Sequence, residues 1–149
     1  MSVPTWKRKE SKALYLDNAR ELVVFTLKFM KKFPKSATFY IATPIMNSAI
    51  NIYKDCATAN NRFPKSTKDF DYRKKYLYDA LGELDSMDCN ISIAIDAYSI
   101  STKDDEKTCE IQSSDYSWAY WGELIYKERE LIKGVIESDN EKKKGITCD

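Results

Sequence analysis

Residues 11–36 read SKALYLDNARELVVFTLKFMKKFPKS and combine a long amphipathic pattern with a proline break. Apolar residues recur there every three or four positions, as they do on one face of an α-helix. Lysine and arginine side chains lie off that face. The pattern stops at Phe33-Pro34, because the residue before a proline is disfavoured in helical geometry. This stretch therefore predicts a helix over residues 11–32, followed by a turn.

Three further segments show the same periodicity. The second predicted helix ends near residue 60, but its start is ambiguous. Thr43-Pro44 suits a capping residue followed by proline at the first helical position, whereas Ser36 suits the start of a longer helix that kinks at Pro44. We favour the longer helix, because residues 39–41 would otherwise form an apolar loop. The other two helices are predicted over residues 67–98 and 114–137, with an exposed polar loop over residues 99–113 between them.

These segments predict a single all-α domain. The chain has 149 residues, which is enough for one hydrophobic core, and its four glycines and four prolines are too few for a many-stranded β fold. Four amphipathic helices with modest connections are typical of an antiparallel up-down four-helix bundle. The predicted organisation is a basic lead-in over residues 1–10, the bundle over residues 11–137 and a flexible lysine-rich tail over residues 138–149.

The amino-acid composition lacks several of the side chains and motifs on which enzymes most often depend. Histidine is absent, so the chain has no histidine base, proton shuttle or metal ligand. The four cysteines lack a Cys-x-x-Cys pair, and we expect Cys56 and Cys89 to be small buried hydrophobes. Neither glycine-rich phosphate-binding pattern occurs. We therefore expect no enzymatic activity, no cofactor and no metal site.

The sequence predicts a cytoplasmic protein with no membrane partner. No apolar run approaches the ~18 residues that span a bilayer, and the basic start lacks the apolar core of a secretory signal. The aromatic content is high, with ten tyrosines, six phenylalanines and three tryptophans. Trp118 and Trp121 lie three residues apart and can share one helix face. Their large combined area predicts an oligomer interface rather than the core of a small monomer.

Charge is distributed unevenly along the chain. The net charge is +1, but residues 1–35 carry nine basic and three acidic residues, so this section is +6 and the remainder is −5. A basic first helix on an acidic body can steer a polyanion to one face, or can pair with the acidic third helix of a neighbouring copy.

Several segments together resemble the accessory variability determinant (Avd) proteins of diversity-generating retroelements, which are related to the four-helix-bundle proteins encoded in ribosomal-RNA intervening sequences. The resemblance covers nearly the whole chain. The segments that carry it are Val3-Pro4-Thr5-Trp6-Lys7-Arg8, Ala19-Arg20-Glu21-Leu22, Phe33-Pro34-Lys35, Asn51-Ile52-Tyr53, Ala59-Asn60, Arg73-Lys74-Lys75-Tyr76-Leu77 and Leu131-Ile132-Lys133-Gly134-Val135-Ile136-Glu137-Ser138-Asp139.

The resemblance implies a ring-shaped homopentamer that binds the reverse transcriptase of the element and its template RNA, supports mutagenic cDNA synthesis and has no catalytic residues. The residues that match its basic contact surface are Lys7, Arg8, Lys9, Lys12, Arg20, Lys28, Lys31, Lys32, Lys35, Arg73, Lys74 and Lys75. The chain departs from the family in its net charge, because members that bind nucleic acid strongly are markedly basic. Since phosphate contacts dominate such binding, the alternative is a structural helical-bundle oligomer of the intervening-sequence type with no nucleic-acid partner.

Overall fold

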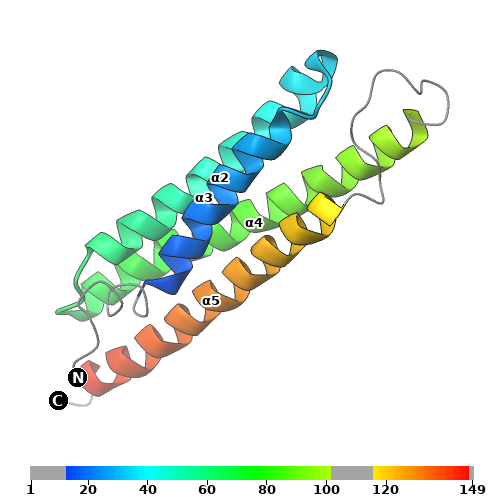
Figure 1. The fold of residues 1–149 in the computed structure, drawn as a ribbon. Helices are drawn as coiled ribbons and strands as arrows, with labels where there is room; N and C mark the ends of the chain where they lie inside the picture. The colour runs from blue at the N-terminus through cyan, green and yellow to red at the C-terminus, as the bar shows by residue number, and fades with distance from the viewer. Residues whose placement is uncertain (1–12, 102–115, 148–149) are drawn as a thin grey trace, which may run out of the picture.

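The computed structural model describes residues 13–101 and 116–147, and within these residues it contains four long helices and no strand. The helices are α2 (Leu14–Met30), α3 (Thr43–Asn61), α4 (Thr67–Ser101) and α5 (Tyr116–Thr147). They run alongside one another in an elongated bundle (Figure 1). Helices α2 and α4 each pack against both α3 and α5, which closes the bundle. The prediction of an all-helical chain with four helices is confirmed.

One apolar core runs along the bundle, and it is built from the predicted helix faces. Every helix contributes fully buried side chains, among them Leu22, Ile45, Leu77, Trp121 and Ile132. Burying one such side chain stabilises the fold by roughly 1.5–3 kcal/mol. The three-and-four spacing that predicted the helices therefore also identified the faces that pack together.

The helical run that contains α3 begins well before Pro44. A 3₁₀ turn (η1, Lys35–Ala37) leads into a π-helical segment (η2, Thr38–Ala42), which continues into α3. Ala42 keeps helical φ and ψ angles of −66° and −46°. The helical run is continuous from Lys35, as the longer helix predicts, but the α-helix itself begins at Thr43 with Pro44 in its first turn, as the alternative predicts. Proline lacks the N–H that the carbonyl four residues earlier would accept from, so Pro44 disturbs the regular α-helical pattern in the turn before it.

Helices α4 and α5 extend beyond their predicted ends. The prediction of a flexible tail from residue 138 is wrong for residues 138–147, which continue α5. The reason is a set of contacts with the start of α4: Arg73 pairs with the buried Asp139, and Lys143 pairs with Asp71. Residues 99–101 of the predicted loop belong to α4, while residues 102–113 and the predicted lead-in over residues 1–10 lie outside the described residues.

The tryptophan pair lies in the core of a single chain, so the prediction that it forms an oligomer interface is wrong. Trp121 is fully buried and Trp118 is nearly so. Their ring centroids are 5.9 Å apart, and each lies 5.0 Å from the ring of Phe29. Both tryptophans therefore pack against Phe29 near the end of α2, within one chain.

The two cysteines in the described residues differ in their surroundings. Cys56 is fully buried, as predicted, whereas Cys89 is exposed, so the prediction for Cys89 is wrong. Met87 and Ile91 on either side of it are buried, and the helical register between them turns position 89 outward. No described helix is long and apolar enough to cross a membrane.

Candidate binding surface

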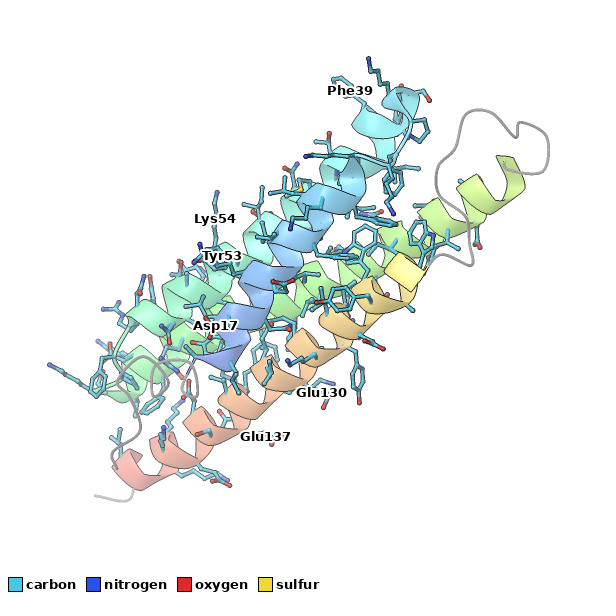
Figure 2. All side chains as sticks on the ribbon, viewed as in Figure 1. Asp17, Phe39, Tyr53, Lys54, Glu130 and Glu137 are labelled. Atoms are coloured by element: carbon cyan, nitrogen blue, oxygen red, sulfur yellow. The ribbon has the colours of Figure 1, made fainter. Side chains whose placement is uncertain are left out.

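The candidate binding surface is one end of the bundle, where α2 passes through η1 and η2 into α3. We call it the lysine-rich tip and define it by Lys28, Lys31, Lys32, Lys35, Phe39 and Tyr40. Figure 2 places Phe39 at the free end of the α2–α3 pair. The tip combines the last turn of α2 with the turn that follows it, so cations and aromatic rings come together within 13 residues of sequence.

The tip has a positive local charge that the net charge of the protein conceals. Residues 22–54 contain five lysines and no aspartate or glutamate. Lys28, Lys31 and Lys35 are exposed, while Lys32 is half-buried with its Nζ 5.5 Å from the centre of the Phe29 ring. The lysines near the end of α2 also complement the negative end of the helix dipole. A cationic surface at this position is therefore compatible with a stable helix.

Two aromatic side chains at the tip are almost fully exposed. Phe39 is 85% exposed and Tyr40 is 84% exposed, more than any other large apolar side chain in the described parts of the chain. Phe33, six residues earlier, is buried against Trp118. Hydrophobic packing therefore accounts for Phe33 and leaves the rings of Phe39 and Tyr40 available for contact with another molecule.

The structure does not bring the twelve predicted contact residues together. Lys28, Lys31, Lys32 and Lys35 lie at the tip, and Arg20 is exposed partway along α2. Arg73, Lys74 and Lys75 lie in the second turn of α4, near the other end of α3. The 19 residues of α3 separate the two ends, which is about 28 Å at a helical rise of 1.5 Å per residue. Lys7, Arg8, Lys9 and Lys12 lie outside the described residues.

Arg73 does not fit the predicted contact role, because its guanidinium group is held within the bundle. Its Nε donates to Oδ2 of Asp139 at 2.8 Å, and its Nη1 donates to the carbonyl oxygens of Ala59 and Arg62, both at 3.1 Å. It therefore ties α4 to the end of α3 and to α5. The next two residues, Lys74 and Lys75, remain on the surface beside tyrosine rings.

An acidic groove lies between α3 and α4, away from the tip. Asp55, Asp79 and Glu83 line it. Burial, together with the charges of Asp79 and Glu83, raises the pKa of Asp55 to about 6. The negative charge of this groove disfavours the approach of anions to it.

Sequence reasoning missed a buried carboxyl group in the core. Glu128 on α5 is fully buried and accepts hydrogen bonds from Nδ2 of Asn18 at 2.8 Å and from Sγ of Cys56 at 3.5 Å. Burial raises its pKa to about 7, although both hydrogen bonds oppose that rise. The signal was present in the sequence, because position 128 falls in the apolar series that includes Ile125 and Ile132.

A small cavity of 390 Å³ lies near the start of α2, away from the tip, and Tyr15, Asn60 and Asp139 are among its lining residues. The Tyr15 hydroxyl donates to Oδ1 of Asn60, and burial raises its pKa to about 12. Within the described residues, no three potential ligands among cysteine, aspartate and glutamate are grouped to hold a metal ion. The polar contacts around this cavity are internal, so the tip offers the stronger case for binding.

The fold and the tip together define a four-helix bundle with a basic, aromatic end. Comparisons with models of protein families, with curated proteins and with solved structures give no match. The function proposed below therefore depends on the residues of this chain and on the resemblance drawn from its sequence.

Proposed function

We propose that this protein is a non-catalytic, cytoplasmic accessory subunit that binds a retroelement reverse transcriptase and its template RNA, and so supports mutagenic cDNA synthesis. The observation that carries the proposal is the lysine-rich tip, where three exposed lysines adjoin two exposed aromatic rings. Cations neutralise phosphates, and aromatic rings contact bases or apolar side chains. Both kinds of contact suit a complex of polymerase and RNA.

The positive charge of the tip supports this role better than the net charge of the whole protein does. A polyanion responds to the charges within about one Debye length, which is roughly 8 Å at physiological salt. Residues 22–54, which include the tip, carry only positive formal charges. All of the acidic residues lie outside this section, and α4 carries seven of them, whereas α3 carries only Asp55.

A second group of contacts is proposed for the N-terminal cations Lys7, Arg8, Lys9 and Lys12, with Arg20, Lys74 and Lys75 contributing further positive charge. Replacing the four N-terminal residues by glutamate should abolish the complex and leave the helical content unchanged. Helicity measured by circular dichroism is the control. Retained binding by that variant would contradict the role of these four residues.

We further propose that the bundle is antiparallel and assembles into a ring-shaped homopentamer. The antiparallel order is supported by contacts between early and late parts of successive helices, such as Tyr15 with Asn60 and Arg73 with Asp139. The assembly is supported by exposed apolar side chains on the outer face of α2, where Leu27 is 51% exposed beside the exposed Val24. Light scattering tests the assembly, and a strict monomer would contradict it.

The experiment that tests the function is capture of tagged protein from its native host lysate, with and without nuclease, followed by mass spectrometry. A reverse transcriptase retained after nuclease treatment supports direct contact with the polymerase. A polymerase lost on nuclease treatment supports bridging by RNA. Recovery of neither polymerase nor RNA, from cells shown to express both, would favour the alternative of a structural oligomer with no nucleic-acid partner.

A further inference from the structure

We propose that the lysine-rich tip binds single-stranded RNA by stacking unpaired bases on Phe39 and Tyr40 while nearby lysines contact the phosphates. This inference rests on the proposed function and names the form of RNA that the tip selects. It starts from the exposure of two adjacent rings within a cationic surface, and both features belong to one short segment of the chain.

The two rings are placed to act as separate stacking platforms. Phe39 and Tyr40 are consecutive residues of η2, and consecutive helical side chains point roughly a quarter of a turn apart. Each ring therefore faces a different direction, which suits two bases splayed from one strand better than a single base held between two rings. Stacking of one base on an aromatic side chain is worth about 1–3 kcal/mol and tolerates any base sequence.

The lysines around the rings supply a path for the backbone. Lys35 begins η1, four residues before Phe39, and Lys28 and Lys31 lie on the end of α2 that leads into this turn. All three are exposed. A strand that crosses the tip can therefore place its phosphates beside lysines and its bases beside the rings.

The combination of rings and cations distinguishes single strands from duplexes. In a duplex, both faces of each base are covered by neighbouring bases, so an exposed ring gains nothing from them. The lysines alone would bind either form through its phosphates. Preference for the single strand thus depends on Phe39 and Tyr40, whereas salt dependence of binding depends on the lysines.

Fluorescence anisotropy with a labelled oligouridine and with an RNA duplex of equal length tests the inference on the full-length protein. We expect tighter binding of the single strand. The double variant Phe39→Ala and Tyr40→Ala should weaken that binding by about tenfold or more and leave duplex binding unchanged. Phe63→Ala is the matched control, because Phe63 is also strongly exposed, at 76%, but lies between α3 and α4 at the other end of α3.

The lysines are tested by replacing Lys28, Lys31 and Lys35 with glutamine. The slope of log affinity against log salt for the single strand should fall in magnitude by about 2, since each lost phosphate contact removes about 0.7. Circular dichroism confirms that each variant is folded.

The outcomes separate the inference from the proposed function. Unchanged single-strand affinity in the aromatic variant, with affinity lost in the lysine variant, overturns base stacking and leaves RNA binding in place. No binding of either RNA by the wild-type protein overturns both the inference and the RNA part of the proposed function. Binding to anionic lipid vesicles is measured with the same variants. If the aromatic variant loses vesicle binding and keeps its RNA affinity, the partner of the tip is a membrane surface, and the inference is overturned.

Discussion

Replacing Glu128 with glutamine should stabilise the protein at pH 8 and reduce the dependence of its stability on pH. Glu128 is fully buried, and burial raises the pKa of its carboxyl group from 4.5 to about 7. The folded state then holds a proton that the unfolded state releases. The contribution of Glu128 to the free energy of unfolding is therefore fully present below pH 4.5 and is lost as the pH rises to about 7.

The size of the effect follows from the change in pKa. A change from 4.5 to about 7 corresponds to about 3 kcal/mol of stability lost once the carboxyl group is ionised in the folded state. Glutamine keeps an oxygen that can accept from Asn18 or Cys56 and cannot ionise. We expect Glu128→Gln to recover about 1–3 kcal/mol at pH 8 and nothing at pH 4.

The assay is urea unfolding followed by circular dichroism from pH 4 to pH 8. The matched control is Glu130→Gln, which removes the same charge from the outer side of α5 (Figure 2). The Glu130 side chain is 52% exposed and pairs with the exposed Lys133 at 3.8 Å, so its loss should change stability by less than about 0.5 kcal/mol. Two results would contradict this role of Glu128. One is that Glu128→Gln destabilises the protein at pH 8, and the other is that the free energy of unfolding of the variant depends on pH between 6 and 8 as strongly as that of the wild type.

Three further predictions concern the frame of the bundle. Asp139→Ala should destabilise the protein by about 3 kcal/mol in urea unfolding, because it removes the buried carboxylate that pairs with the mostly buried guanidinium of Arg73; a change below about 1 kcal/mol would contradict the pairing. Ser66→Ala should cost about 1 kcal/mol, since Ser66 Oγ accepts from the backbone N–H of Asp69 at the start of α4 and the Asp69 carboxylate accepts from the N–H of Ser66; an unchanged unfolding midpoint would count against this cap. Trp121→Ala should cost about 3–5 kcal/mol in urea unfolding, because Trp121 is fully buried in the core of one chain; a cost below about 1 kcal/mol would contradict that position in the core.

The helices and their inward faces were predictable because helical periodicity is a local property of the sequence. Leu22, Ile52 and Leu84 each belong to the three-and-four series of apolar residues in their helix, and all three are fully buried. The end of α5 was not predictable in this way. Residues 138–147 look polar, and they stay helical because Asp139 pairs with Arg73, 66 residues away. A contact between distant residues leaves no periodic signal in either segment.

The candidate surface was predictable only in part. The charge count over residues 1–35 included Lys28, Lys31, Lys32 and Lys35, but the resemblance added Arg73 with equal weight, although its guanidinium is held within the bundle. Exposure of Phe39 and Tyr40 could not be inferred, because aromatic residues near a helix most often pack. The tetrapeptide Phe-Pro-Lys-Ser occurs at residues 33–36 and again at residues 63–66, yet Phe33 is buried and Phe63 is exposed. Tertiary packing, and not local sequence, separates them.

The central claim is that the lysine-rich tip holds the reverse transcriptase and its RNA. Its most direct test is co-purification of the polymerase with wild-type protein and with two charge-reversal variants of equal size. One variant carries Lys31→Glu and Lys35→Glu at the tip, and the control carries Lys65→Glu and Lys68→Glu, which are exposed at the other end of α3. We predict loss of the polymerase with the tip variant and retention with the control, both variants being equally helical. Retention of the polymerase by a folded tip variant would contradict the claim.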